Sequence, residues 1–279
     1  MKNNPTQHVE YYAELRAFLE GSNESEVTRG HLRKILEKRL QGIPKDYDFS
    51  VLDVGCSDGE MILPLVAELR EKLPRLKYVA LEPETSAFKR LVEGIKKQGL
   101  NFIQPVNKPV KEYLKTVKGK EGLFDFVLFS ESFYYFPQVE WDDIFSDTLR
   151  LLRPNGFAMV IIESLEGQAY KLYDLITSGR ADVLEFGYPY YAEHAERFLT
   201  GKGIRFETER FPIYIFVKDD EQKLTRFVRT LAFIYHTFPE KILTNYREPV
   251  EKFMEECKGD GQYALENVVK IITFAKSRQ

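Results

Sequence analysis

A loop containing two glycines follows a short apolar segment, and its residue types are typical of a site that binds a small molecule. Residues 51–54 are apolar apart from Asp53, and Gly55, Ser57 and Gly59 follow directly. Glycines at a strand-to-helix turn let the backbone approach a ligand closely, and the next helix offers free N–H groups at its start. Two glycines by themselves also fit an ordinary tight turn.

An acidic residue, Glu82, strengthens the ligand-binding interpretation of this loop. It follows the apolar segment 78–81 and lies 23 residues after Gly59. A carboxylate about 20 residues beyond a glycine loop can accept hydrogen bonds from both hydroxyls of a ribose. Taken alone, Glu82 equally fits a carboxylate that stabilises the start of the next helix. The loop and Glu82 together predict a cofactor that contains a nucleoside.

The loop also discriminates between cofactors. It lacks the Gly-x-Gly-x-x-Gly spacing that favours NAD and the Gly-Lys-Ser/Thr of an ATP-binding P-loop. Asp53 beside the loop suits an ammonium group and would repel a phosphate. S-adenosylmethionine carries such an ammonium group and is therefore the cofactor that we expect. The residues of this part of the chain that we expect to bind the cofactor are Asp53, Gly55, Ser57, Gly59 and Glu82.

Composition and charge limit the other classes of function. The 279 residues include 40 basic and 43 acidic side chains, so no basic surface for nucleic acid is expected. The two cysteines fit a reducing compartment, and the four histidines lack the spacing of metal ligands, so we expect no metal. Neither a signal peptide nor a membrane-spanning run is present, which predicts a soluble, cytoplasmic protein without a membrane partner. The oligomeric state is not indicated.

The elements that must position these residues alternate between strands and helices. This alternation predicts an α/β fold with a parallel sheet and helices on both faces. Two helices, 8–20 and 25–40, precede the first strand. The apolar patterns then predict strands at 51–54, 78–81, 101–103, 124–129, 157–162, 205–217 and 268–274, and helices at 60–73, 85–98, 141–152, 166–178, 190–200, 220–238 and 248–257.

We predict three parts of the chain from this order of elements. Residues 1–45 form an N-terminal helical extension, and residues 46–218 with 263–279 form the cofactor-binding α/β domain. Residues 219–262 form a late helical insertion. The extension and the insertion are expected to close over the substrate as a cap and to exclude water.

The motifs resemble those of the class I S-adenosylmethionine-dependent methyltransferases. The resemblance is carried by Asp53-x-Gly55-x-x-x-Gly59, by Glu82, and by Leu-Leu-Arg-Pro-Asn-Gly at 151–156. Ser57 stands where the usual loop has its middle glycine. The resemblance implies a Rossmann-like methyltransferase sheet and places Ser130 near the sulfonium of the cofactor.

Within that class, the chain is similar to the histamine N-methyltransferase family. The similar pieces are the segments 11–24, 51–60, 81–83 and 133–135, and a final strand that Asn267 precedes. The resemblance implies that the substrate is a small molecule bound by Tyr11, Glu24, Glu131, Tyr135 and Asn267. Two positions depart from the family. Glu131 replaces a glutamine, which makes the pocket more acidic, and Ala87 replaces a glutamine that contacts adenine.

Two carboxylates and an aromatic cluster suit a ligand with a cationic amine, because ring faces and carboxylates both attract cations. We therefore expect N-methylation of a small amine. Glu24 and Glu131 are the predicted catalytic residues, which orient the amine and relay its proton. Methyl transfer to a neutral amine runs largely on proximity and orientation. O- or C-methylation, and a methyltransferase-like domain that binds without catalysis, are the alternatives.

Overall fold

The computed structural model describes residues 15–177, 190–235 and 239–276. The chain divides into two compact units. The predicted division into an extension, a domain and an insertion stays a prediction. Unit 1 contains Met1–Val27, Glu163–Tyr190 and Phe211–Val269, and unit 2 contains Thr28–Ile162, Tyr191–Arg210 and Lys270–Gln279.

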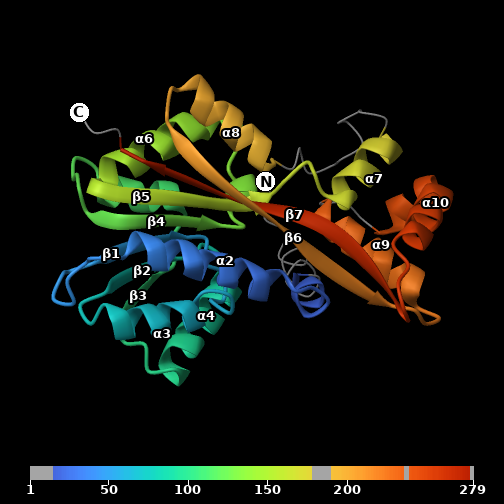
Figure 1. Cartoon of the computed structure of the whole chain (residues 1–279), viewed down its shortest axis with the longest axis horizontal. Helices are drawn as coiled ribbons and strands as arrows, with labels where there is room; N and C mark the ends of the chain where they lie inside the picture. Colours follow the sequence, from blue (N-terminus) through green and yellow to red (C-terminus); the bar gives the residue numbers. More distant parts are fainter. Residues whose placement is uncertain (1–14, 178–189, 236–238, 277–279) are drawn as a thin grey trace. The chain divides into compact units, whose positions relative to one another are not determined.

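Seven strands form one sheet in the order β3-β2-β1-β4-β5-β7-β6 (Figure 1). Strands β1 to β5 pair in parallel, as the alternation of elements predicts. The N–H of Asp219, just after β6, donates to the carbonyl of Gly261, just before β7. The last two strands are therefore antiparallel to each other, and the sheet is mixed. The strands are β1 Ser50–Val54, β2 Lys77–Leu81, β3 Ile103–Val106, β4 Phe124–Ser130, β5 Leu152–Glu163, β6 Phe206–Lys218 and β7 Gln262–Ala275.

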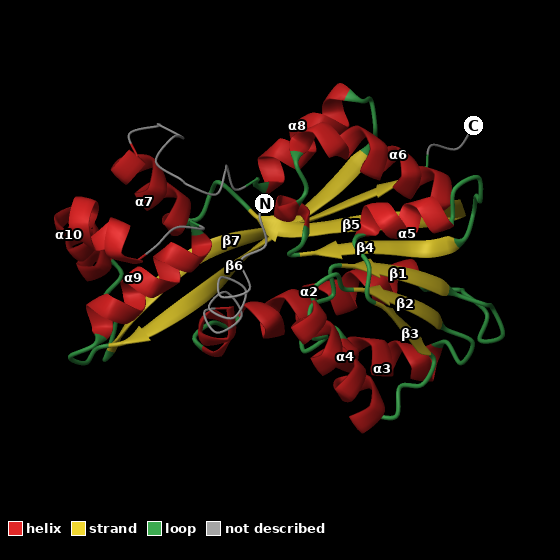
Figure 2. Ribbon diagram, turned by 180° about the vertical axis from the view of Figure 1, so that it is seen from behind, coloured by secondary structure: helices red, strands yellow, loops and turns green. Residues whose placement is uncertain are grey.

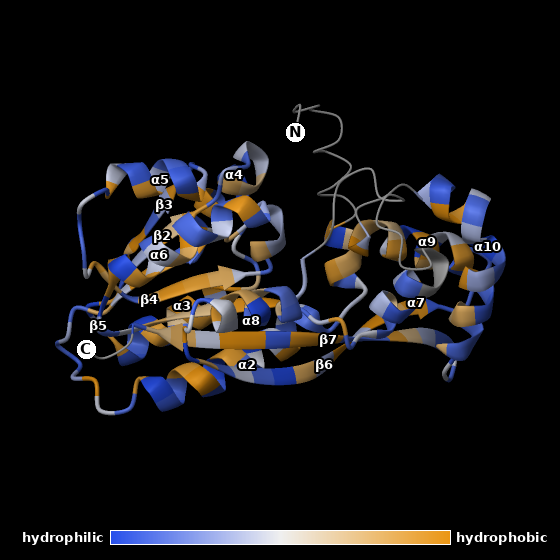
Figure 3. Ribbon diagram, turned by 90° about the horizontal axis from the view of Figure 1, so that it is seen from above, coloured by the Kyte–Doolittle hydropathy of each residue, from blue (hydrophilic) through white to orange (hydrophobic). Residues whose placement is uncertain are grey.

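Helices connect the strands and lie on both faces of the sheet in unit 2. Figure 3 shows α2 on one side of β4 and β5 and α5 on the other. Figure 2 shows the helices and strands by element type, seen from behind. Helix α5 was not among the predicted elements. The helices are α2 Glu24–Arg39, α3 Leu63–Lys72, α4 Thr85–Lys97, α5 Val110–Thr116, α6 Trp141–Leu151, α7 Gln168–Thr177, α8 Ala192–Gly201, α9 Lys223–Ile234 and α10 Pro239–Glu256.

Two prolines explain local details of the later elements. Pro212 lies within β6, which is the last strand of the sheet order, where a missing N–H donor is tolerated. Pro249 lies inside α10, which continues across the non-helical backbone of Tyr246. The sequence predicts a helix over 248–257, whereas α10 already begins at Pro239.

The burial of the strands follows from how many of their faces are covered. All five residues of β1 and the first six of β4 are buried, which fits continuous apolar strands covered on both faces. Strand β7 alternates between buried and half-buried residues over 263–269, within unit 1. It is continuously buried over 269–274, where it enters unit 2. Asn267 is one of the buried residues in the alternating part of β7, residues 263–269.

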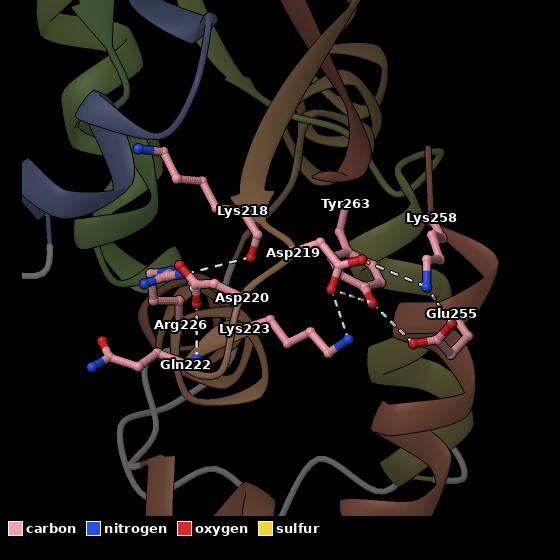
Figure 4. A network of polar contacts seen from close by, with 9 residues as sticks. All are labelled: Lys218, Asp219, Asp220, Gln222, Lys223, Arg226, Glu255, Lys258 and Tyr263. Carbon is pink, nitrogen blue, oxygen red and sulfur yellow. Dashed lines mark hydrogen bonds and ion pairs between the residues drawn. The ribbon is translucent and has the colours of Figure 1, made fainter. Parts of the chain in front are cut away.

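A polar network fixes the turn after β6 in unit 1 (Figure 4). Asp219 accepts from Lys223 Nζ at 2.7 Å, and Tyr263 Oη donates to Glu255 at 3.0 Å. Asp220 accepts from the N–H of Gln222 at 2.8 Å and thereby holds the start of α9. Exposed ion pairs of this kind contribute little to stability, so we assign the network a role in local geometry.

Among the described residues, none of the helices combines the length and the apolar character that a membrane span requires.

Candidate functional site

The predicted cofactor-binding residues lie at the carboxyl ends of β1, β2 and β4 in unit 2. Val54 pairs in register with Leu81 of β2 and with Phe129 of β4, so these three strands end at one edge of the sheet. The glycine loop, Glu82 and Ser130 follow or end those strands. Ligands of open α/β sheets bind at this edge, beside the point where the strand order reverses.

The glycine loop after β1 has a left-handed backbone at three positions. The φ angles are 76° at Gly55, 51° at Ser57 and 81° at Gly59. The N–H groups of Gly55 and Cys56 both donate to the carbonyl of Leu81, at 2.8 and 3.1 Å. Positive φ at a non-glycine residue such as Ser57 is uncommon and concentrates at functional sites. The loop is therefore tied to β2 and held in a conformation that most sequences avoid.

Gly55 is required by its own chain. A Cβ atom at Gly55 would lie 2.6 Å from Cβ of Ser132, well inside the normal contact distance. Ser132 is itself fixed, because its hydroxyl donates to the carbonyl of Val54 at 2.6 Å and its side chain is buried. A side chain at Gly55 would thus disturb the packing of the loop before any ligand arrives.

Glu82 is buried and bridges the glycine loop to the start of α4. Its Oε2 accepts the N–H of Ser57 at 2.8 Å, and its Oε1 accepts the N–H of Glu84 at 2.8 Å. Burial raises the pKa of Glu82, while these two backbone donors lower it. A carboxylate offers about four acceptor sites, so each oxygen keeps capacity for one further donor. Both sequence interpretations of Glu82, a helix-start carboxylate and a hydroxyl acceptor, are compatible with this geometry.

Asp53 is buried beneath the loop with one oxygen bound and one unsatisfied. Its Oδ2 accepts from the hydroxyl of Tyr78 at 2.7 Å, whereas Oδ1 has no partner among the described residues. Burial is the main cause that raises the pKa of Asp53 to about 7, and the charge of Glu82 adds to it. A buried acceptor without a donor is costly. An ammonium group would satisfy this oxygen, so the site fits the amino-acid part of S-adenosylmethionine.

Two other residues near the loop offer no reactive or binding group. Burial raises the pKa of the Cys56 thiol well above its ordinary value, so little thiolate is present. Ala87 is completely buried, and its N–H donates to the side chain of Glu84 at 2.6 Å.

The residues after β4 combine backbone strain with an aromatic cluster. Glu131 has a φ of 47°, and its N–H donates to the carbonyl of Ile161 at 2.9 Å. Tyr135 is 41 % exposed and contacts the ring of Tyr134, with 4.7 Å between centroids. Phe133, in contrast, is fully buried. Of this segment, Tyr135 is exposed, Glu131 is half-buried, and Phe133 belongs to the core.

Unit 1 contains a second group of predicted site residues, centred on an acid that the sequence interpretation missed. Glu24, the first residue of α2, is 6 % exposed, and its Oε2 has no hydrogen-bond partner within the described chain. Burial raises the pKa of Glu24 to about 8, and the charge of Glu163 contributes. Burial also raises the pKa of Glu163 to about 7.

Asn267 of β7 completes this group. Its Nδ2 donates to Glu163 Oε1 at 3.1 Å, and its Oδ1 accepts the N–H of Ala169 at 3.2 Å. Two predicted substrate residues, Glu24 and Asn267, are therefore neighbours of Glu163. Glu163 directly follows the apolar run 157–162, and this position at the end of a strand was the signal that could have identified it. The predicted substrate residue Tyr11 lies outside the described residues.

Comparison with known proteins gives a domain match within unit 2. Residues 51–156 match the family described as a methyltransferase domain. This segment runs from β1 into β5 and contains every predicted cofactor-binding residue, from Asp53 to Ser130. No protein of curated function matches the chain. A search for groups of three or more metal-ligating side chains among the described residues finds none.

Solved structures share the fold at low sequence identity. A candidate methyltransferase from Bacillus halodurans has a TM-score of 0.55 at 16 % identity, with 86 % of this chain and 98 % of that chain covered. A candidate sarcosine dimethylglycine methyltransferase from Galdieria sulphuraria has a TM-score of 0.53 at 16 % identity, with coverage of 90 % and 86 %. Phosphoethanolamine N-methyltransferase 2 from Haemonchus contortus has a TM-score of 0.50 at 15 % identity, with coverage of 88 % and 52 %. The chain thus has the Rossmann-like methyltransferase fold.

Proposed function

We propose that this chain is an S-adenosylmethionine-dependent methyltransferase whose methyl acceptor is a small amine. The methyltransferase activity is supported by the match of residues 51–156 to a methyltransferase domain. This segment builds the sheet edge that carries the glycine loop, Asp53 and Glu82. The choice of a small amine as methyl acceptor is supported by the acidic character of the predicted substrate residues Glu24 and Glu131.

The side chains of unit 2 divide the binding of S-adenosylmethionine between them. Glu82 accepts the ribose hydroxyls with the capacity that Ser57 and Glu84 leave free. Asp53 Oδ1, which lacks a donor within the described chain, accepts from the ammonium of the methionine part. The loop at Gly55 and Gly59 lets the backbone approach the cofactor. When bound, the cofactor supplies a methyl group that is activated for transfer by the positive sulfonium.

The amine is bound by carboxyl groups and rings. Glu24 and Glu131 orient it and take up its proton, Tyr11 and Tyr135 offer ring faces, and Asn267 supplies an amide. The names of two structures with the same fold, which refer to sarcosine and phosphoethanolamine, are compatible with such an acceptor. Glu131 in place of the glutamine of the histamine N-methyltransferase family favours a substrate with more positive charge than histamine.

Calorimetric titration with S-adenosylmethionine and S-adenosylhomocysteine tests the cofactor, and a mass-spectrometric screen of biogenic amines and amino acids tests the acceptor. Saturable cofactor binding and a product heavier by one methyl group on nitrogen are expected. Methylation at oxygen or carbon would replace the amine proposal by the alternative acceptor. Cofactor binding without methylation of any acceptor would indicate a binding domain, and no cofactor binding would overturn the proposal.

A further inference from the structure

Two acids of unit 1, 139 residues apart in the sequence, come together without a basic partner among the described residues. Glu24 begins α2 and Glu163 ends β5. Asn23, next to Glu24, is hydrogen-bonded to the backbone of Tyr214 in β6 at 2.7 and 3.1 Å, and Glu163 is bonded to Asn267 of the neighbouring strand β7. The charge of Glu163 accordingly raises the pKa of Glu24. Neither acid takes part in an ion pair with a lysine, arginine or histidine of the described chain. Such an arrangement is costly unless a proton or a cation neutralises it.

The two acids differ in how firmly they are held. Glu163 is oriented by Nδ2 of Asn267, and the N–H of Ala169 in turn fixes Asn267. Gly167 belongs to the same arrangement, because a Cβ at that position would lie 2.8 Å from Asn267 Oδ1. Glu24, in contrast, has a buried Oε2 that finds no donor among the described side chains and backbone groups. One acid is thus positioned in advance, and the other has an acceptor atom without a donor in the described part of the chain.

We propose that Glu163 is a specificity-determining residue that, together with Glu24, binds the cationic nitrogen of the methyl acceptor. This inference rests on the proposed function and adds to it a residue that the sequence does not assign. Glu163 supplies the oriented carboxylate, and Glu24 supplies the acceptor atom that lacks a donor. A neutral ligand of the same shape would leave the acids protonated and would gain no charge-assisted hydrogen bond, so this pair selects cations.

We also expect the two acids to release a proton when a cationic ligand binds. In the free protein the acids hold protons near neutral pH, because burial raises the pKa of Glu24 to about 8 and of Glu163 to about 7. Among the described residues, Glu163 is the charged group that acts on Glu24, and Asn267 is the hydrogen-bond partner of Glu163. A bound cation favours the carboxylate form. Binding of an ammonium should therefore release about one proton at neutral pH.

The test is calorimetry on the full chain saturated with S-adenosylhomocysteine. The probes are histamine, sarcosine and phosphoethanolamine, each beside its N-acetylated counterpart, in two buffers of different ionisation enthalpy. At least one amine should bind with proton release, and its acetylated form should not. Glu163→Gln, which keeps the shape, should weaken binding of that amine roughly tenfold or more and reduce proton release to the share of Glu24, whereas Glu163→Asp should retain part of the affinity. Glu248→Gln, which changes an exposed acid of unit 1, should bind like wild type.

The outcomes separate this inference from the proposed function. Failure of the wild type to bind S-adenosylhomocysteine would overturn the proposed function, and the amine titrations would then be run without it. If none of the three amines binds, or if Glu163→Gln binds the amine as tightly as wild type, the two-acid site is wrong. Unchanged affinity of Glu163→Gln for S-adenosylhomocysteine establishes that the variant is folded.

Discussion

The backbone N–H of Ser57 donates to Glu82 Oε2 at 2.8 Å and so joins the glycine loop after β1 to the end of β2. The other oxygen of Glu82 accepts the N–H of Glu84 at the start of α4. One carboxylate therefore holds the loop and the helix start in a single arrangement. A cofactor bound at Glu82 depends on a residue that also fixes the shape of its own site.

Replacement of Glu82 by glutamine should weaken cofactor binding and loosen the loop together. A glutamine side chain has one acceptor oxygen, so either Ser57 or Glu84 loses its backbone acceptor. We expect a loss of roughly 1.5–3 kcal/mol in the binding of S-adenosylmethionine, the scale of a hydrogen bond to a charged group. Calorimetry measures this loss. Glu84→Gln, which changes only the helix start, is the control, and unchanged affinity of Glu82→Gln would remove Glu82 from the site.

Replacement of Gly55 by alanine should destabilise the protein even without cofactor. The new Cβ would lie 2.6 Å from Cβ of Ser132, and φ at this position is 76°. Gly99→Ala is a matched control, since Gly99 has a φ of 68° but no atom within 4 Å of the added Cβ. The left-handed backbone costs both variants about 1–2 kcal/mol, and the close contact adds about 1–3 kcal/mol for Gly55→Ala alone. Urea unfolding of both variants measures the difference, and equal losses would show that Ser132 moves aside.

The sheet edge that carries the glycine loop could be predicted from sequence because its signals are local. The apolar runs of β1 and β4 are buried on both faces, and such strands are continuous in sequence. Two of the left-handed positions, Gly55 and Gly59, are also occupied by glycine, the residue that adopts a positive φ most readily. Ser57 is the exception, because its left-handed backbone at a φ of 51° is not evident from its residue type.

Features that depend on distant parts of the chain could not be predicted in this way. The antiparallel arrangement of β6 and β7 follows from the hairpin-like contact of Asp219 with Gly261, which strand patterns do not encode. In the sequence, Glu163 is a polar residue at the end of an apolar run, and such residues are common. The role that we propose for Glu163 depends on its position beside Glu24 and Asn267, two residues from other elements. The predicted helix 248–257 covers only the later part of α10, which begins at Pro239 and continues across the non-helical backbone of Tyr246.

Replacement of the two predicted catalytic acids, Glu24 and Glu131, by glutamine should affect the substrate and spare the cofactor. The double variant keeps the shape of both side chains and removes their charge. We expect the KM of the amine identified in the screen to rise about tenfold or more, the scale of losing a charge-assisted hydrogen bond. Affinity for S-adenosylhomocysteine should stay near wild type, since Glu82 and Asp53 are untouched. A double variant that methylates its amine with an unchanged KM would contradict the assigned roles.

The free energy of unfolding should fall as the pH rises from about 5 to 8, because Glu24 and Glu163 keep protons in the folded protein that they lose when it unfolds. Burial raises their folded pKa values to about 8 and about 7, above the ordinary value of 4.5. In this interval the folded state binds more protons than the unfolded state, so stability decreases with pH. Asp53, with a pKa raised to about 7, acts in the same direction in unit 2.

The double variant Glu24→Gln/Glu163→Gln isolates the contribution of this pair. His194, whose pKa burial lowers, makes stability rise with pH, but it is present in both proteins and cancels in their difference. Glu68 and Glu84, whose pKa values are lowered, lose their contribution only at more acidic pH. The variant should therefore gain stability over wild type at pH 8 and little at pH 5, as urea unfolding at the two pH values measures. An equal difference at both pH values would mean that the two acids are already ionised in the folded protein, because only protonated acids make the effect depend on pH.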